Sequence, residues 1–347
     1  MRGDSVKKTV ALIYGGEGEE RHISKRSAAA IYPHISRDEY DVVPVYISPG
    51  GAWYISEQNP FGNSPTANAR PTYPVKLHGT SGMLTEGRIM KIDCAIPLLH
   101  GELGEDGVIT GALRACGIPF VGEGVGSSAL CADKIYTRLV ADSLGIRGAD
   151  WLWDMGCERE CILRAKKRAE QKLGYPMFIK PATLGSSIGA SPILKEEDFI
   201  PAYISAARGG RRVLIERLVD IDLEVECALI FVGGERRLSA SGIVRSERKF
   251  YSYERKYGGR GPKISHGVAK TDLLLKIEDM ARTLSEAINL RSMARLDFFV
   301  DVSGNIYFNE INTVPGMTES SLYPRLTEDM GYPPFEFINL LIREAIG

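Results

Sequence analysis

Residues 293–312 have the sequence MARLDFFVDVSGNIYFNEIN, in which two strand-like runs flank a Ser-Gly turn. A hairpin centred on this turn pairs Asp297 with Glu310 and Arg295 with Asn312. Side chains alternate between the two faces of a strand, so all four lie on one face. Two opposed carboxylates repel each other and destabilise a sheet, and a cation between them removes that cost. The hairpin therefore predicts a cation site.

The residue types in this hairpin indicate which cation it would bind. Asp297, Glu310 and Asn312 offer oxygen ligands without Cys or His, which is the set that Mg²⁺ or Mn²⁺ prefers. Magnesium usually completes its shell with water and phosphate oxygens, so the pattern favours a nucleotide site. The alternative is a surface hairpin with incidental charges. A register change of one residue would also undo the prediction.

A second candidate site is the loop PATLGSSIG at 181–189, between predicted strands over 177–180 and 213–216. The chain contains no GxxxxGK[ST] string, so this loop is not a P-loop. Its N–H groups and hydroxyls can nevertheless bind phosphate, and Lys180 offers a point charge to the same group. A flexible linker is the alternative interpretation.

The first half of the chain alternates strand and helix patterns, which predicts a parallel sheet with ligands at the carboxyl ends of its strands. We expect strands over 10–14, 40–47 and 95–98, and helices over 24–32 and 108–116. Residues 56–88 are rich in Asn, Pro, Thr and Gly, and they are predicted to form an irregular insertion.

Two acidic loops follow strands of this predicted sheet. GGEGEERHIS at 15–24 lacks the third glycine of a dinucleotide-binding loop, and its acids would hold an ammonium group rather than a pyrophosphate. The ordinary preference for acids at a helix N-terminus, worth about 0.3–1 kcal/mol, is the alternative. HGELGEDG at 100–107 suggests a ligand loop at the same edge, although a lone His such as His100 is more often structural.

The second half is predicted to contain further strands and helices around one irregular segment. We expect Asp133 to cap a helix over 133–144. Further helices are predicted over 158–173, 272–289 and 334–346, and further strands over 223–231 and 238–244. Residues 246–265 mix Arg, Lys, Tyr and Gly without periodicity, which predicts a mobile loop. Taken alone, that loop is as well explained by a solvated charged surface as by a lid.

Composition excludes several classes of protein. With 347 residues the chain suits about two or three packed domains. Its net charge of -1 gives no electrostatic footprint for nucleic acid or an anionic membrane. No apolar run approaches the ~20 residues of a membrane span, and the apolar start is interpreted as a buried strand rather than a signal peptide. Six cysteines without a CxxC pair argue against zinc and indicate a reduced, cytoplasmic protein.

Taken together, these residues resemble the D-alanine–D-alanine ligase family of ATP-grasp enzymes over almost the whole chain. The most specific strings are LGEDG at 103–107, GSSIG at 185–189, RLD at 295–297 and NEINTVPGMT at 309–318. The resemblance implies an α/β fold of three domains. These are an N-terminal parallel-sheet substrate domain (1–126), a central ATP-grasp subdomain (127–219) and a C-terminal catalytic domain (220–347) with the mobile loop 246–265.

The resemblance also implies a nucleotide site with two Mg²⁺ or Mn²⁺ ions. Asp297, Glu310 and Asn312 match the metal ligands, in agreement with the hairpin. The residues that match ATP-binding positions are Lys134, Lys180, Ser187, Glu216, Arg217, Leu218, Val219 and Glu224. Glu224 matches the glutamate that binds the ribose hydroxyls, and its spacing from Glu216 is one residue longer than is usual in the family.

Substrate-binding residues are implied in the same way. Glu20 matches the acid that anchors the ammonium of the first substrate, with Ser186 and Tyr257 as its hydrogen-bonding partners. The other matches are His100 in the first-substrate pocket, Arg295 and the Gly316 N–H as oxyanion donors, and Ser321 and Lys256 at the carboxylate of the second substrate. The chain departs from the family pattern at His22, usually an acid, and at Thr183-Leu184, usually more polar.

The implied activity is ATP-dependent ligation of two D-alanines through an acyl phosphate, for peptidoglycan precursors, by a cytoplasmic homodimer. A D-alanine–D-serine ligase remains open, whereas D-lactate is less favoured because Lys256-Tyr257 resembles dipeptide-forming members. Another ATP-grasp carboxylate–amine ligase is a further alternative, and Glu20, Ser186 and Tyr257 argue against it. A nucleotide-binding module without catalytic activity would be expected to lack some of the metal ligands or oxyanion donors. All of them are present in this sequence.

Overall fold

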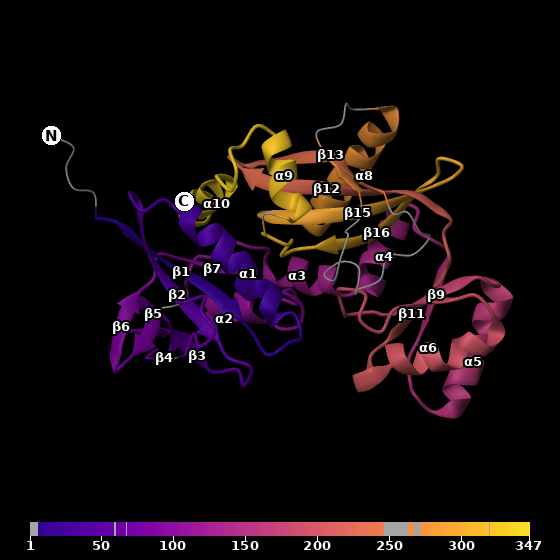
Figure 1. The fold of residues 1–347 in the computed structure, drawn as a ribbon, viewed down its shortest axis with the longest axis horizontal. Coiled ribbons are helices and arrows are strands. Elements are labelled where there is room, and N and C mark those ends of the chain that lie inside the picture. Colours follow the sequence, from indigo (N-terminus) through magenta and orange to yellow (C-terminus); the bar gives the residue numbers. More distant parts are fainter. Residues whose placement is uncertain (1–5, 59, 67, 246–262, 267–270, 319) are drawn as a thin grey trace.

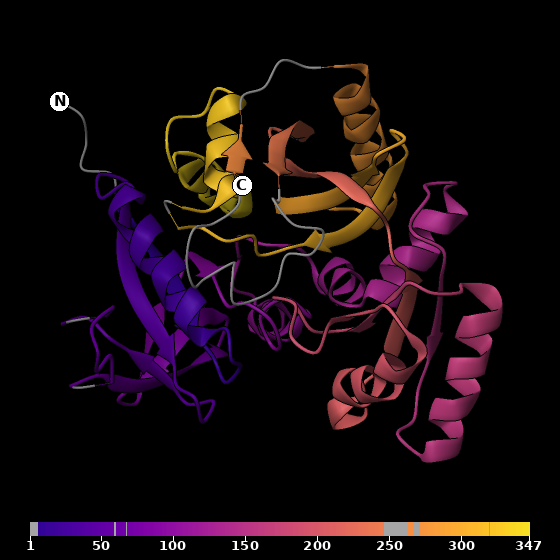
Figure 2. The same ribbon diagram turned by 45° about the vertical axis from the view of Figure 1, so that its right-hand side comes forward.

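The computed structural model describes residues 6–347 apart from positions 59, 67, 246–262, 267–270 and 319. Three β-sheets, each with its own helices, form three bodies that can be distinguished in both Figure 1 and Figure 2. The N-terminal body and the four-stranded body lie at opposite ends, and the C-terminal sheet lies above and between them in these views.

The N-terminal sheet has seven strands in the order β6-β5-β4-β3-β2-β1-β7. Its parallel part contains β1 (Lys8–Gly15), β2 (Tyr40–Ile47) and β7 (Cys94–Pro97). Helix α1 (Arg21–Ile31) covers one face of β1 and α2 (Val108–Ala115) covers the other. A strand covered on both faces requires a continuous apolar run, which is why β1 was recognisable in the sequence.

Residues 70–88 form antiparallel strands, so the predicted irregular insertion is wrong for this part of 56–88. The described residues of 56–69 form no strand, as expected. The antiparallel part of the sheet comprises β3 (Trp53–Ile55), β4 (Arg70–Leu77), β5 (Thr80–Thr85) and β6 (Arg88–Lys91). The two-residue turns His78-Gly79 and Glu86-Gly87 have positive φ at both positions, the conformation that matches the twist of paired strands. Their first residues are not the usual Asn or Asp, which concealed both hairpins in the sequence.

The middle of the chain forms an antiparallel four-stranded sheet in the order β10-β9-β11-β8. Its elements are β8 (Trp151–Asp154), α5 (Arg159–Lys172), β9 (Met177–Pro181), β10 (Ser191–Ile193), α6 (Phe199–Ala206) and β11 (Val213–Arg217). Short 3-10 turns cover Glu196–Asp198 and Arg208–Gly210, and another, Tyr32–His34, follows α1. Helices α5 and α6 bury one face of this sheet.

Two helices connect this body to the rest of the molecule, α3 (Val125–Ala132) and α4 (Lys134–Ser143). The Asp133 carboxylate accepts hydrogen bonds from the N–H groups of Ile135 and Tyr136, at 2.9 and 3.4 Å. The predicted helix cap is therefore confirmed, and it fixes the start of α4.

The C-terminal sheet has five strands in the order β14-β13-β12-β15-β16. Its elements are β12 (Ile221–Val232), β13 (Glu235–Arg245), β14 (Lys263–Ser265), α8 (Asp272–Ile288), β15 (Met293–Asp301), β16 (Ile306–Asn312), α9 (Leu322–Asp329) and α10 (Phe337–Ile346). One face of this sheet packs on α8, and the other shares a core with α1, α9 and α10. No helix in the described part of the chain is long and apolar enough to cross a membrane.

The predicted pairing within 293–312 is confirmed, although its turn differs. Asp297 lies opposite Glu310 and Arg295 opposite Asn312, whereas Val300 pairs with Ile306. The register shifts by one residue between these two regions, at a bulge that contains Asn309. The bulge compensates for a longer turn, so the carboxylates meet on one face as expected.

Candidate active site

A pocket of about 500 Å³ lies between the four-stranded sheet and the C-terminal sheet. All eight residues predicted to bind ATP line it, from Lys134 on α4 to Glu224 on β12. Ser186, Arg295, Asp297 and Glu310 line the same pocket. The structure thus brings together residues from four separate stretches of the chain.

A buried charge network forms one wall of this pocket. The Lys180 ammonium contacts Glu216 at 2.7 Å and donates to the Asn309 side-chain oxygen at 3.1 Å. Arg138 donates to the other Glu216 oxygen and to the Phe308 carbonyl oxygen. Burial lowers the pKa of the Lys180 ammonium, whereas Lys180 and Arg138 together lower the pKa of the Glu216 carboxyl despite its burial.

Arg138 is a pocket residue that sequence reasoning missed. Its side chain is only 2% exposed, so it acts as a buried counter-ion rather than a surface charge. The signal was present, because Arg138 follows Lys134 by one helical turn and therefore shares its face of α4. The carbonyl of the bulged strand and the carboxylate of Glu216 are both fixed by this one guanidinium.

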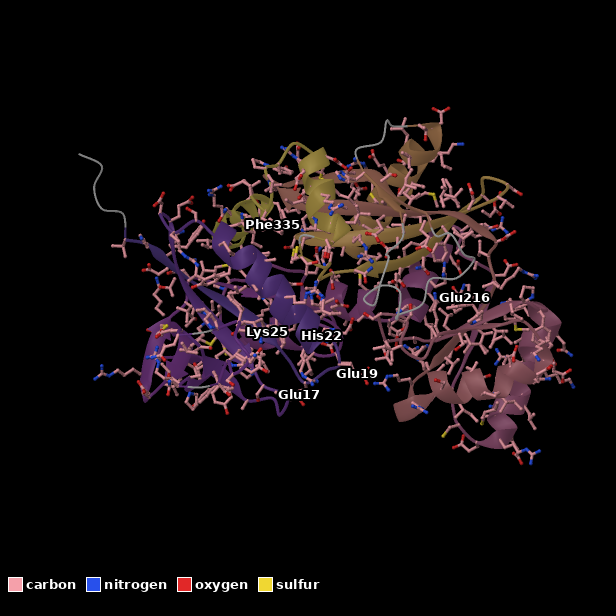
Figure 3. The ribbon with its side chains drawn as sticks, viewed as in Figure 1. Glu17, Glu19, His22, Lys25, Glu216 and Phe335 are labelled. Carbon is pink, nitrogen blue, oxygen red and sulfur yellow. The ribbon has the colours of Figure 1, made fainter. Side chains whose placement is uncertain are left out.

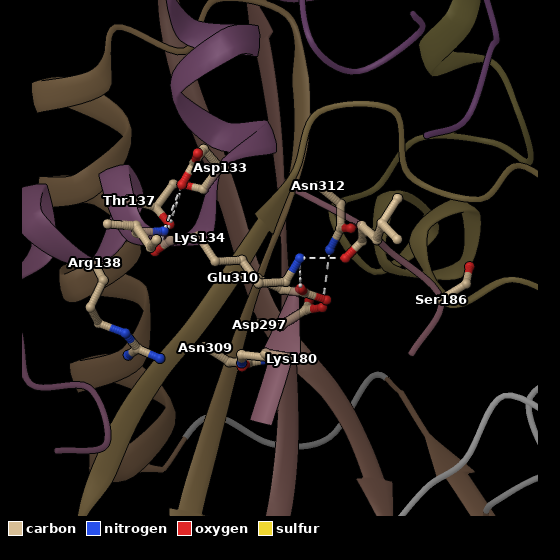
Figure 4. A network of polar contacts seen from close by, with 12 residues as sticks. Asp133, Lys134, Thr137, Arg138, Lys180, Ser186, Asp297, Asn309, Glu310 and Asn312 are labelled. Atoms are coloured by element: carbon tan, nitrogen blue, oxygen red, sulfur yellow. Dashed lines mark hydrogen bonds and ion pairs between the residues drawn. The ribbon is translucent and has the colours of Figure 1, made fainter. Parts of the chain in front are cut away.

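Lys134 connects helix α4 with the Gly/Ser loop and with the hairpin that carries Glu310 (Figure 4). Its ammonium donates to the carbonyl oxygen of Leu184 at 2.7 Å, within the Gly/Ser loop, and lies 3.6 Å from a Glu310 carboxylate oxygen. The loop carries two non-glycine residues of positive φ, Ser186 at 52° and Ser187 at 60°. Successive left-handed residues turn backbone N–H groups toward one side, which suits the binding of an anion.

The hairpin presents a cluster of opposite charges to the pocket. Arg295 donates two hydrogen bonds of 2.7 Å to Asp297, and Asn312 Nδ2 donates a third at 3.1 Å. Glu226 on β12 lies 3.2 Å from Arg295 Nε. Burial, with Glu226 and Glu310 nearby, raises the pKa of Asp297 to about 6 even though Arg295 opposes the shift.

Asp297, Glu310 and Asn312 fit a hard divalent cation. Among the described residues no cluster of three or more His, Cys, Asp or Glu side chains could hold a metal, and this set has two carboxylates and an amide. Magnesium is commonly bound by one or two carboxylates together with phosphate oxygens and water. The donor set is therefore too small for an all-protein metal cage but adequate beside a nucleotide.

The N-terminal body contributes Glu20 to the edge of the site. Ser186 donates a hydrogen bond to the Glu20 carboxylate, and a side chain at Gly101 would lie 2.5 Å from that carboxylate. Glycine at 101 thus permits the loop to approach Glu20. Figure 3 shows three further residues of the segment 15–24, Glu17, Glu19 and His22, near the start of α1.

His100 and the turn after β16 lie beside the same edge. His100 Nε2 is 3.1 Å from the Ser27 hydroxyl, which accepts a hydrogen bond from the Met317 N–H at 3.4 Å. In the adjoining turn the Ser321 hydroxyl accepts from the Thr318 N–H at 3.1 Å. A side chain at Gly316 would lie 2.9 Å from that hydroxyl, so the predicted residues Gly316 and Ser321 are close neighbours. The predicted residues Lys256 and Tyr257 lie outside the described residues.

These features define a class of enzyme. An antiparallel four-stranded sheet and a larger antiparallel sheet enclose a pocket of buried lysines, a Gly/Ser loop and paired carboxylates, which is the ATP-grasp arrangement. The D-ala D-ala ligase N-terminus model matches residues 9–123, and the D-ala D-ala ligase C-terminus model matches residues 141–343. The chain belongs to the D-alanine–D-alanine ligase family, and it is a ligase.

Individual relatives agree with this assignment along the whole chain. D-alanine–D-alanine ligases from Thermoanaerobacter sp. (strain X514) and Deinococcus radiodurans are each 35% identical, over 98% of this chain and 97% and 99% of theirs. The VanG D-Ala:D-Ser ligase from Enterococcus faecalis has a TM-score of 0.86 at 31% identity, covering 97% of this chain and 99% of its own. The D-alanine–D-alanine ligase from Coxiella burnetii has a TM-score of 0.85 at 28% identity, covering 99% of this chain and 94% of its own.

Proposed function

We propose that this ligase joins two D-alanine molecules to form D-alanyl-D-alanine at the expense of ATP, for peptidoglycan precursor synthesis in the cytoplasm. The observation that carries the proposal is the hydrogen bond between Ser186 and Glu20. It joins an ammonium-binding carboxylate to the loop that lines the nucleotide pocket. A first substrate held by Glu20 would present its own carboxylate to the transferable phosphate. The family resemblance adds that the chain acts as a homodimer.

In the first step, the carboxylate of one D-alanine attacks the γ-phosphoryl group of ATP and forms an acyl phosphate. Two anions approach each other, so positive charge must surround them. Lys134 and Lys180, which both line the pocket, supply it, and Ser187 adds a hydroxyl and an N–H group. Release of Lys180 from Glu216 would free its ammonium for phosphate.

Nucleotide recognition is assigned to a second group of residues that lines the same pocket. We assign Glu216 and the segment Arg217–Val219 to the adenine, and Glu224 to the ribose hydroxyls. Asp297, Glu310 and Asn312 would hold two Mg²⁺ or Mn²⁺ ions. Such ions supply charge neutralisation at the phosphate oxygens.

In the second step, the amine of the second D-alanine attacks the acyl carbon and phosphate leaves. The developing oxyanion is stabilised by Arg295 and the Gly316 N–H, and losing one such donor typically costs ~2.7–4 kcal/mol. The amine must be neutral, which costs little because an α-amino pKa lies near ~8. Ser321 and Lys256 are assigned to the carboxylate of this second substrate, and Tyr257 and His100 to the first-substrate side.

A D-alanine–D-serine ligase is the second candidate, favoured by the similarity of this structure to the VanG D-Ala:D-Ser ligase. Both candidates share the first substrate and both chemical steps. They differ only in whether the second pocket accepts a hydroxyl. The departures at His22 and Thr183-Leu184 lie on the first-substrate and phosphate side, so they do not decide between the two.

The test is phosphate release from MgATP by the purified chain with D-alanine, L-alanine, D-serine or D-lactate. We expect release with D-alanine alone, with D-alanyl-D-alanine as the product. Release only when D-serine or D-lactate accompanies D-alanine would retain the mechanism and change the second substrate. ATP binding without release in any mixture would contradict the proposal and favour a different ATP-grasp ligase or a nucleotide-binding module without catalytic activity.

A further inference from the structure

Glu226 is a partly buried residue to which neither the sequence motifs nor the proposed mechanism assigns a task. It lies on β12 directly opposite Asp297 of β15, and it lines the nucleotide pocket. Only 17% of its side chain is exposed. Glu224 precedes it by two residues on the same strand, so both side chains face the pocket.

The contacts of Glu226 converge on one cation. Its Oε2 atom lies 3.2 Å from Arg295 Nε, the same nitrogen that donates to Asp297 at 2.7 Å. Glu226 Oε2 is buried and has no hydrogen bond in the described part of the chain. A buried carboxylate oxygen without a hydrogen bond is costly unless a cation compensates for its charge. Arg295 is therefore the group that accounts for a carboxylate at this position.

Arg295 is held mainly by a residue that has a second task. A carboxylate offers about four lone-pair positions. Asp297 uses two for Arg295 and one for Asn312. About one position is then left for the two divalent cations proposed at this site, so these cations and Arg295 would compete for the same oxygens. Arg295 would then lose part of its anchorage at the moment when it must face the reacting carbonyl.

We propose that Glu226 is a positioning residue that keeps Arg295 directed toward the developing oxyanion when Asp297 is engaged by a cation. In this proposal Glu226 acts through the Arg295 guanidinium, which it contacts at 3.2 Å. Its negative charge, rather than its shape, is the property required. This inference rests on the proposed function, because it assumes the oxyanion role of Arg295.

The test compares Glu226→Gln, which keeps the shape, with Glu226→Asp, which keeps the charge. We expect kcat to fall roughly 10- to 100-fold in Glu226→Gln, because a catalytic group displaced by about 1 Å can cost 10²-fold. Glu226→Asp should retain more activity than Glu226→Gln. The KM for ATP and the affinity for ADP, measured by calorimetry without turnover, should change less than about threefold. Glu235→Gln, an exposed site at the far end of the same sheet, is the matched control.

A double-mutant cycle with Arg295→Lys identifies the route of the effect. If Glu226 acts through Arg295, adding Glu226→Gln to Arg295→Lys should lower kcat far less than it does in the wild type. Additive losses, or Glu226→Gln more active than Glu226→Asp, would overturn the inference. Wild-type chain without ligase activity would instead overturn the proposed function, so the two failures are distinguishable.

Discussion

Ser186 donates a hydrogen bond to Glu20 although 166 residues separate them in the chain. Ser186 lies in the loop after β9 of the four-stranded sheet, and Glu20 precedes α1 of the N-terminal body. The contact therefore joins two of the three bodies at the edge of the pocket. The donor residue has a left-handed backbone, with φ at 52°.

Replacing Glu20 by Gln is expected to lower kcat/KM for D-alanine by roughly 10- to 150-fold. A hydrogen bond to a charged group contributes about 1.5–3 kcal/mol, and Gln cannot neutralise the substrate ammonium. The KM for ATP should change little. Steady-state phosphate release at varied D-alanine measures the effect, with the neighbouring exposed acid as the control variant Glu19→Gln. Equal losses in the two variants would contradict a specific role for Glu20.

Replacing Glu310 by Gln should lower turnover by at least roughly 10²-fold, since the phosphate charge then lacks its full cation complement. Binding of Mn²⁺ in the presence of ADP, followed by electron paramagnetic resonance, should weaken in parallel. Unchanged ATP-dependent activity would refute the assignment of Glu310 as a metal ligand.

Replacing Arg138 by Met removes the buried counter-ion of Glu216. Loss of one partner from a buried pair costs about 3–5 kcal/mol, and Lys180 at 2.7 Å retains part of the compensation, so we expect the lower end of this range. Urea unfolding measures the stability. The KM for ATP should rise as well, because Lys180 stays engaged with Glu216. Arg138→Lys should recover part of both losses, and a Met variant of native stability would contradict the counter-ion role.

Replacing Gly148 by Ala should destabilise the fold. A side chain there would lie 1.6 Å from Arg138 Nη1, and Arg138 is enclosed by Glu216 and Phe308. Overpacking of this kind typically costs about 1–3 kcal/mol. The matched control is Gly126→Ala in α3, where nothing lies within 4 Å of the added carbon. That control should be neutral or stabilising by up to about 1 kcal/mol, as Ala replaces Gly in a helix.

Glu123 should make stability depend on pH. Burial raises the pKa of Glu123 to about 7, although the N–H groups of Arg291 and Ser292 donate to it and oppose the shift. The folded state then binds a proton that the unfolded state has released, so this contribution falls as pH rises from about 4.5 to 7. The total is roughly 3 kcal/mol, at about 1.4 kcal/mol per pKa unit. The free energy of unfolding, measured with urea at several pH values in this range, should depend less on pH in Glu123→Gln than in the wild type. An equal dependence on pH in the two proteins would contradict the prediction.

Local chemistry explains why much of the site was predictable. The charged side chains of 293–312 lie on one face because side chains alternate along a strand. Asp133 caps α4 by accepting a hydrogen bond from the N–H group of Ile135, two residues further along the chain. The hairpins at His78-Gly79 and Glu86-Gly87 were missed because sequence patterns favour Asn-Gly and Asp-Gly turns. The bulge at Asn309 was also not predicted. The predicted pairing of Asp297 with Glu310 is correct because this bulge offsets the extra residue in the turn. The domain boundaries at 126 and 219 remain predictions.

The sequence by itself determined the family, the parallel strands of the N-terminal sheet and the residue types of the nucleotide pocket. Apolar periodicity, glycine spacing and charge alternation are all properties of short segments. Only the tertiary structure decided that Arg138 is the counter-ion of Glu216 and that Glu226 contacts Arg295. These pairs come from different elements, and their energies depend on burial. A charge acquires a required partner only when folding removes the water that would otherwise solvate it.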